Sequence, residues 1–476
     1  MLTYSIDNTV ILRAASILGL SAITVVCLPA EEANAPAPRP VIKTQGFVPY
    51  SDAPIHYRSQ QLGDPVAKLE KRLESGEIVL DYDPKFGYLK SVLKALNVPA
   101  SSQTLVFSKT SFQFPNITPA TPRALYYNDD IYIGRVHNGK FLEFISFDPM
   151  QGAIFYILDD QPSPHPVFER SEVDCVQCHV APATHGVPGV MLRSVYTKPS
   201  GVQAAGTPAF ITGQESPINQ RWGGWYVTAR SGPPVHMGNV TVAGSGVLTP
   251  VAKILPATLP SLRTALDTSA YLTDTSDIVA QLVLAHQTQM HNLITETNYK
   301  TRLALYAGPS DDRTDAVRNQ FESPSEQLVR YMLFTNEAKL DAPIEGTSGF
   351  AEEFAARGPR DPHGRSLREF DLHKRIFKYP CSYLIYSADF DAIPEPAKQY
   401  IYRRLFEVLS GRDQSPEFAS LSRQDRGAIL EILMATKPGL PDRWNKFLQK
   451  AGQANSTALL PARFAINHKQ SEGNHE

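Results

Sequence analysis

The chain has 476 residues, of which 42% are hydrophobic and 20% charged, as in an ordinary globular protein and unlike a disordered or membrane-embedded one. Its length allows two or three packed regions. The formal net charge of -2 comes without a basic block, which excludes the electrostatic footprint of a nucleic-acid-binding protein.

An apolar segment near the amino terminus predicts export. Residues 14–28, AASILGLSAITVVCL, follow Arg13 and are too short for a comfortable membrane span, but they suit the apolar region of a signal peptide. Ala33 and Ala35 then offer a small-x-small cleavage site. We therefore expect residues 1–35 to be a signal peptide that is cleaved after Ala35.

The segment allows two other interpretations. One is an uncleaved membrane anchor, because the residues ahead of the apolar stretch include Asp7 and only one arginine, Arg13. A lipoprotein attached through Cys27 is disfavoured, because bulky Val26 stands where a small residue is expected. With cleavage, the protein is expected to be periplasmic or otherwise exported and to have no integral membrane span.

The region from residue 36 to 165 predicts an antiparallel sheet with one or two helices. Helix-like segments near 66–76 and 86–96 precede runs rich in β-branched and aromatic residues. The turn-forming separators NDD, HNG and DPMQG divide these runs. The expected strands are 104–108, 124–128, 130–136, 140–147 and 153–158. The acidic pair Asp129 and Asp130 lies in one of the separators, so a turn is favoured over metal binding or acid-base chemistry.

The segment SEVDCVQCHV, residues 171–180, contains the motif with the most specific chemistry. A CxxC redox pair does not require the histidine that follows it, and zinc needs four ligands, for which no second CxxC or HxxxH is present. The remaining reading is a covalent haem c, with thioether links at Cys175 and Cys178 and His179 as the proximal iron ligand. A short helix is expected here.

The loop that follows, VAPATHGVPG, is expected to orient the imidazole of His179. A ligating histidine normally donates its second ring N–H to a carbonyl, and the Pro182 or Pro188 region offers free acceptors. His185 in the same loop is read as a solvent-exposed histidine in preference to a catalytic one.

Two neighbouring segments could flank a haem. RWGGWYV, residues 221–227, carries Trp222 and Trp225, which form either a wall at the haem edge or part of an ordinary core, with a strand expected at 225–229. PPVHMGNV, residues 233–240, places Met237 in a Pro/Gly-rich loop as the preferred sixth iron ligand.

The identity of the sixth ligand stays open at this point. His236 is the neighbour of Met237, and the amphipathic segment 276–296 carries His286 and Met290 four residues apart, with His291 beside them. Alternatively, Met290 belongs to the core and the histidines are satisfied by hydrogen bonds. A further alternative is an iron with an open sixth position.

The pattern is mainly helical from residue 246 to the end. The expected helices are 276–296, 323–338, 364–378, 395–409, 421–435 and 441–451. The segment YPCSYLIYS, residues 379–387, is too apolar for a surface loop, so Cys381 is read as a buried small hydrophobe. The predicted class is α+β: an N-terminal sheet region (36–165), a loop-rich haem-attachment region (166–245) and a helical C-terminal region (246–476).

The motifs resemble those of known haem proteins. CVQCH followed by a Met-bearing loop is similar to small c-type cytochromes, although this chain is several times longer. The wider set YYNDDIYIG, THGVPGVMLRSVY, RWGGWYVTARSG with HMGN, HQTQMHN and KYPCSYLIYSADFD resembles a family of large exported monohaem proteins that are labelled cytochrome c domain proteins. The resemblance covers most of residues 100–445 and implies one covalent haem c, but no named reaction.

Two main functions follow from these expectations. In the first, the protein is an electron-transfer cytochrome with His179 and Met237 on the iron and a redox partner protein or small-molecule oxidant. In the second, it is an exported haem enzyme of peroxidase or oxygenase type, with His236, His286 or His291 as acid or base near an open iron face. A haem-bearing binding or sensor module without turnover is a third possibility.

Overall fold

The computed structural model describes residues 48–58, 60–242, 251–307 and 315–444. Contacts divide the chain after Thr44, and every described residue belongs to the unit that begins at Gln45. The expected signal peptide, 1–35, and most of the expected helix 441–451 lie outside the described residues.

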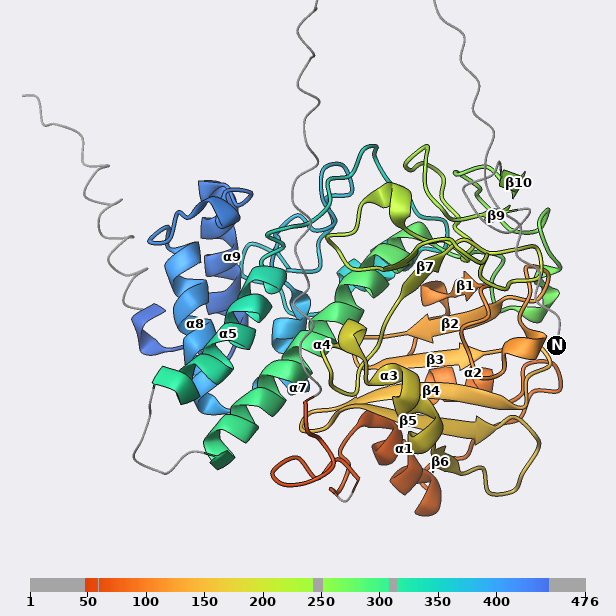
Figure 1. The fold of residues 1–476 in the computed structure, drawn as a ribbon, viewed down its shortest axis with the longest axis horizontal. Helices are drawn as coiled ribbons and strands as arrows, with labels where there is room; N and C mark the ends of the chain where they lie inside the picture. Colours follow the sequence, from red (N-terminus) through yellow and green to blue (C-terminus); the bar gives the residue numbers. More distant parts are fainter. Residues whose placement is uncertain (1–47, 59, 243–250, 308–314, 445–476) are drawn as a thin grey trace, which may run out of the picture. The chain divides into compact units, whose positions relative to one another are not determined.

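A six-stranded antiparallel sheet forms the N-terminal part, with its strands in sequence order (Figure 1). This sheet and the helical C-terminal part confirm the predicted α+β class. The strands are β1 (Thr104–Val106), β2 (Arg123–Tyr127), β3 (Ile131–Arg135), β4 (Phe141–Asp148), β5 (Gly152–Asp159) and β6 (Phe168–Arg170). Smaller two-stranded sheets pair β7 (Arg193–Val195) with β8 (Ala209–Ile211), and β9 (Val240–Val242) with β10 (Val251–Ile254).

The two faces of the sheet belong to different hydrophobic cores. Successive side chains of a strand point to opposite faces, so residues an odd number of positions apart are on different sides: Phe144 of β4 packs in one core and Phe147, three residues on, in the other. Helices α1 (Pro65–Glu74) and α2 (Leu89–Ala95) contribute to the core around Phe144. The carboxylate of Asp64 caps α1 by accepting from the N–H of Val66 at 2.9 Å.

Helix α4 (Ile278–Ala307) is the longest helix, with 30 residues, and connects the sheet to the C-terminal helices. It begins where Asp277 accepts hydrogen bonds from the N–H groups of Val279 and Ala280, at 2.8 and 3.2 Å. Almost every side chain as far as Tyr299 is buried, so the helix is covered all round and continues well past the predicted end at 296. Figure 1 shows it running between the sheet and the other helices.

The C-terminal region is helical, as predicted. Its helices are α5 (Asp315–Met332), α6 (Phe350–Ala356), α7 (Ala388–Asp391), α8 (Glu395–Leu409) and α9 (Arg423–Thr436). The chain also contains short 3₁₀ helices at Ala100–Ser102, Phe114–Asn116, Pro182–Thr184, Ile218–Gln220, Thr268–Ala270, Tyr383–Tyr386 and Pro416–Phe418. The α8 bounds match the predicted 395–409, and α9 lies close to the predicted 421–435.

Some sequence expectations are wrong. No helix forms over 364–378, where Asp371 closes a tight turn by accepting from the N–H groups of His373 and Lys374, both at 2.8 Å. The helix expected at 323–338 begins earlier and ends at Met332, because Phe334 takes a left-handed φ of 55°. No regular strand forms at 225–229, where only isolated bridges pair Trp225 with Val106 and Thr228 with Asp277.

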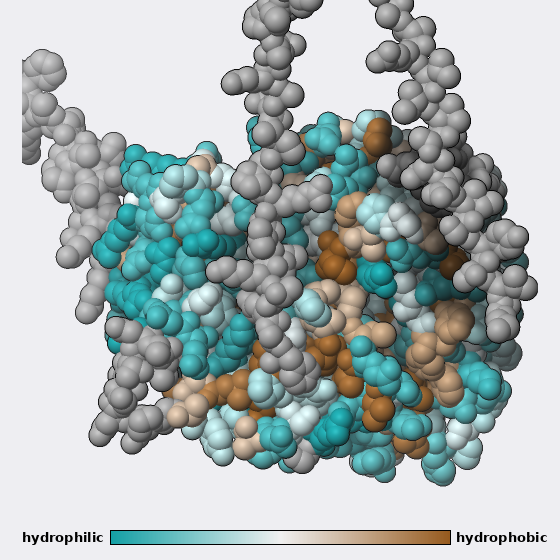
Figure 2. Space-filling view, viewed as in Figure 1, coloured by the Kyte–Doolittle hydropathy of each residue, from teal (hydrophilic) through white to brown (hydrophobic). Residues whose placement is uncertain are grey.

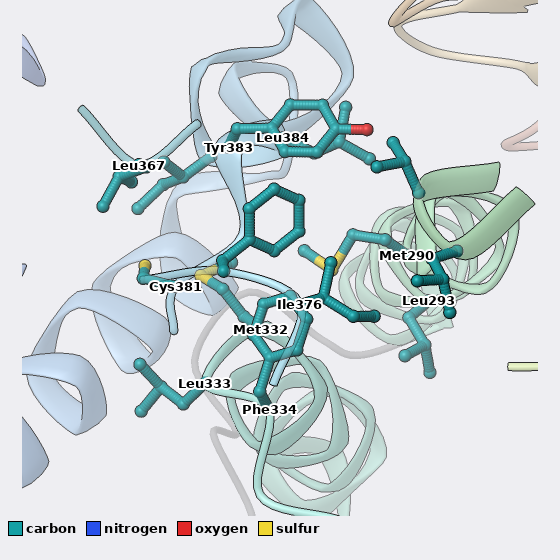
Figure 3. Close-up of a cluster of buried hydrophobic side chains, with 14 of the residues drawn as sticks. Met290, Leu293, Met332, Leu333, Phe334, Leu367, Ile376, Cys381, Tyr383 and Leu384 are labelled. Carbon is teal, nitrogen blue, oxygen red and sulfur yellow. The ribbon is translucent and has the colours of Figure 1, made fainter. Parts of the chain in front are cut away.

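Helix α4 and the segment 379–387 meet in the larger core (Figure 3). Cys381 is fully buried there, which confirms its reading as a small hydrophobe, and burial raises the pKa of its thiol to about 12. Met290 lies in the same cluster with Met332 and Ile376. In the described part of the chain, no helix is both long and apolar enough to cross a membrane.

Candidate functional site

The CxxCH motif lies on a short helix at the surface. Helix α3 (Glu172–His179) forms where expected and has acidic residues in its first turn, which favour the positive end of the helix dipole. It packs on β5, and the N–H of Ser171 donates to the carbonyl of Phe155 at 3.0 Å. No α3 residue is fully buried, and Val173 is 67% exposed.

The two thiols are free and lie three residues apart on this helix. Cys175 is half-buried and Cys178 is exposed. Burial raises the pKa of Cys175 to about 11, so its thiol is protonated at neutral pH. A redox CxxC pair instead has a lowered thiol pKa at a helix N-terminus. Across the described residues, no three His, Cys, Asp or Glu side chains are gathered so that they could hold a metal ion.

His179 ends α3 with its imidazole fixed in one orientation. Its Nδ1 lies 2.8 Å from the carbonyl oxygen of Gly189, and because a carbonyl can only accept, Nδ1 carries the proton. Burial lowers the pKa of the imidazole, which is therefore neutral. No described residue hydrogen-bonds Nε2, so its lone pair is available to a metal. The ring packs 5.0 Å from that of Phe155 on β5.

The predicted acceptor for His179 was one residue away from the one observed. The sequence indicated the carbonyls of Pro182 or Pro188, and the acceptor is Gly189, the neighbour of Pro188. The Pro188 carbonyl instead accepts from the N–H of Ala153 on β5 at 3.4 Å. The loop is thereby attached to the sheet that also supports α3.

His185 is less exposed than its reading as a solvent histidine implied. Its side chain is 25% exposed, and its Nδ1 lies 3.1 Å from Oε2 of the fully buried Glu296 on α4. Burial by itself would raise the pKa of Glu296, but His185 and Lys300 hold it below its usual value. The loop after the motif therefore contacts α4 through His185 and Glu296.

An apolar patch adjoins the thiols. It consists of half-buried side chains that pack against one core: Leu125 and Ile145 from the sheet, Leu192 before β7, and Cys175 and Val176 from α3. Figure 2 shows hydrophobic residues gathered on this face over the sheet and α3. A porphyrin ring requires such an apolar surface beside its attachment points, so the donor atoms and the patch together fit a haem c group.

A charged pair adjoins the apolar patch. Arg123 on β2 and Glu143 on β4 form an ion pair at 2.9 Å, and both are mostly covered. The Glu143 carboxylate also accepts hydrogen bonds from the hydroxyl of Ser111 at 2.6 Å and the amide of Gln113 at 2.7 Å. The negative charge of Glu143 adds to the effect of burial on Cys175, where both raise the pKa. On His179 it opposes burial, which lowers the pKa.

Met237, the preferred sixth ligand, lies in a separate group of contacts. It is 6% exposed, and its sulfur lies 3.6 Å from the hydroxyl of Ser194 on β7. Its backbone N–H donates to the carbonyl of Arg221 at 3.0 Å. Among the described residues, no hydrogen bond, ion pair or ring contact joins Met237 to α3.

His236, the neighbour of Met237, has both ring nitrogens engaged. Nε2 lies 3.1 Å from the carbonyl of Ala257, and Nδ1 accepts from the N–H of Gly238 at 3.0 Å. Burial lowers the pKa of this imidazole. The histidine is thus neutral and already hydrogen-bonded on both sides.

The histidines of α4 are also hydrogen-bonded within the core. His286 lies 2.6 Å from the side-chain oxygen of Gln214 and 2.8 Å from the hydroxyl of Ser382, and burial lowers its pKa to about 3. His291 lies 3.2 Å from the carboxylate of Asp389 and 2.8 Å from the carbonyl of Asp129.

The tryptophan pair and the acidic pair also have defined surroundings. Trp222 and Trp225 are both buried and line a cavity of about 10 Å³ together with Leu192, enough for one water molecule. Asp129 and Asp130 occupy the predicted turn between β2 and β3. Asp129 is ion-paired with Arg368, and burial raises the pKa of Asp130 to about 6.

The comparisons with known proteins return no relatives. No protein-family model, curated protein or solved structure matches the chain. The interpretation of the site therefore depends on the residues of this chain.

Proposed function

We propose that the protein is an exported monohaem c-type cytochrome that binds haem c covalently and transfers electrons. Cys175 and Cys178 would hold the group by thioether links, and His179 would be the proximal ligand. The observation that carries the proposal is the neutral imidazole of His179, which has Nδ1 committed to the Gly189 carbonyl and Nε2 free, directly after two free thiols on one helix.

The bound group would supply one-electron redox chemistry. The chain's own residues would hold it on the apolar patch and keep water from one side. Phe155 supports the ring of His179, and Ile145 stands opposite Phe155 in the β4–β5 register. The partner would be a redox protein or a small-molecule oxidant, and residues 1–35 would direct export.

Met237 is proposed as the residue that would supply the second protein ligand to the iron. A thioether in that position favours a closed, high-potential electron carrier. Both ring nitrogens of His236, His286 and His291 already have protein partners, and Met290 is in the core, so these four are less available than the Met237 sulfur. Ligation would require the sulfur to give up its contact with Ser194.

An exported haem enzyme with an open iron position is the second candidate. It is favoured by one observation, the burial of Met237 at 6% exposure beside Ser194, because a sulfur held there leaves the second face of the iron exchangeable. Peroxide or oxygen chemistry would then be accessible.

The attachment of haem is tested by the double variant Cys175→Ala with Cys178→Ala. We expect the wild type to show a pyridine haemochrome spectrum of thioether-linked haem and the double variant to lose it completely. Cys381→Ala is the control, since this thiol is buried in the other part of the chain and should leave attachment unchanged. Covalent haem in the double variant, or none in the wild type, would contradict the proposal.

The sixth ligand is tested by Met237→Ala. Loss of a thioether ligand should lower the midpoint potential and allow the ferrous protein to bind carbon monoxide, which the wild type should not do. Met290→Leu is the matched control for loss of a buried methionine sulfur, and it should keep the wild-type spectrum. Ready carbon monoxide binding by the wild type would instead select the enzyme with an open iron face.

A further inference from the structure

Asn292 of α4 holds the loop that follows α3, residues 180–190 (the attachment loop). Its side chain is fully buried, its Oδ1 accepts from the N–H of Val190 at 2.9 Å, and its Nδ2 donates to the Val190 carbonyl at 2.7 Å. One side-chain amide therefore satisfies both polar groups of one loop residue. Two such buried bonds fix the backbone of Val190 relative to α4.

Val190 is bonded to the residue that orients His179. Gly189 accepts from Nδ1 of His179 at 2.8 Å and donates its N–H to the His179 carbonyl at 3.0 Å. A Cβ placed on Gly189 would overlap with the Asn292 side chain, so loop and helix are in direct contact at this point. A short chain of contacts thus leads from Asn292 through Val190 and Gly189 to the imidazole.

A second contact lies one helical turn further along α4. Glu296 is four residues after Asn292 and therefore shares its helix face. Its carboxylate lies 3.1 Å from Nδ1 of His185, in the middle of the same loop. Helix α4 consequently holds the loop at two points.

We propose that Asn292 is a positioning residue for the proximal iron ligand: it fixes the Gly189 carbonyl and thereby the orientation and donor strength of the His179 imidazole. The inference rests on the proposed function, because it takes His179 to be the haem ligand. Hydrogen-bonded partners of a ligating histidine raise its basicity, and their loss weakens metal affinity or activity by about 10- to 100-fold. Asn292 acts through two backbone residues and makes no contact with the reacting atoms.

The test compares the midpoint potentials of exported proteins that retain covalent haem. Asn292→Ala frees the loop, so the Nδ1 hydrogen bond weakens, the imidazole becomes a poorer donor, and the potential should shift to a more positive value. Asn292→Leu removes both hydrogen bonds to Val190 at similar side-chain size and without adding a charge, and its shift should have the same sign. Thr297→Ala is the control: Thr297 is buried on α4, and its hydroxyl donates to the Leu293 carbonyl of the same helix at 2.7 Å.

The outcomes separate this inference from the proposed function. A positive shift in Asn292→Ala, with the potential of Thr297→Ala unchanged, supports the positioning role. Wild-type potentials in both Asn292 variants, with haem attached, would overturn it and leave the proposed function intact. If Asn292→Ala does not fold, Asn292→Leu, which keeps the side-chain size, decides alone. A wild type without haem would overturn both.

Discussion

Glu337 shows how one buried carboxyl makes stability depend on pH. Burial raises its pKa to about 7 against the opposing effect of Arg221 and Arg375, while its Oε1 accepts from the N–H of Ile376 at 2.7 Å. The folded protein therefore binds a proton that the unfolded chain releases near pH 4.5. The free energy of unfolding is therefore undiminished below pH 4.5, falls as the pH rises to 7, and stays at this reduced value above pH 7.

Glu337→Gln should remove this decrease because the amide oxygen still accepts from Ile376 but no longer ionises. We expect the variant to match the wild type near pH 4.5 and to be more stable at pH 8, by at most about 3 kcal/mol. Urea unfolding at the two pH values measures the difference. The exposed Glu345, which pairs with Arg230, gives the control Glu345→Gln. An equal gain at both pH values would refute the assignment.

For individual residues of the candidate site, the sequence indicates the two thiols and His179 but not the residues that support them. The CxxCH spacing is local, so it can be read from the chain directly. Gly189 was missed by one position, and Asn292 lies 102 residues from its partner Val190, a separation that no local pattern reveals. The available signal was the spacing of polar residues on α4, where Asn292 and Glu296 fall on one face of a helix that is buried all round.

Among the elements, strands with clear turn residues between them were predicted well. The separators before β3, β4 and β5 fix where each strand ends, and alternating β-branched and aromatic residues mark the strands themselves. The three-residue β6 has too little sequence to form a pattern, and it was missed. Tertiary pairing with β5 is what orders it.

The failed helix at 364–378 has a specific physical cause. Phe370 and Phe377 are seven residues apart, a spacing that resembles two helical turns. In the fold they meet across a tight turn instead, as an isolated antiparallel bridge with their rings stacked 5.2 Å apart. Asp371 stabilises that turn by accepting two backbone hydrogen bonds, and Leu372 takes a positive φ of 55°, which no helix tolerates.

At the scale of the whole molecule, α4 couples the candidate haem site to the C-terminal helices. The larger core extends from Phe155 and Val190 beside the site to Phe406 on α8 and to Trp444, which follows α9. Helix α4 packs on β5, α5 and α8 and also holds the attachment loop. Residues of the N-terminal sheet, the segment around α3 and the C-terminal helices all contribute to this core, so the described part of the chain should lose its structure cooperatively.

This cooperativity can be measured with the tryptophans. The chain has three, and the variant Trp222→Phe with Trp225→Phe leaves only Trp444, which is fully buried and packs 5.5 Å from the ring of Phe406 on α8. In urea, the fluorescence of Trp444 and the Soret absorbance of the proposed haem should change together, because both would depend on the shared core.

Far-ultraviolet circular dichroism of the wild type supplies the reference unfolding transition. The same measurement on the variant shows whether the two replacements alter stability. Loss of the Trp444 signal at a lower urea concentration than the Soret band would contradict the expectation. It would mean that α8 and α9 unfold before α4 releases the attachment loop, and that Asn292 retains its hold on Val190 without support from the C-terminal helices.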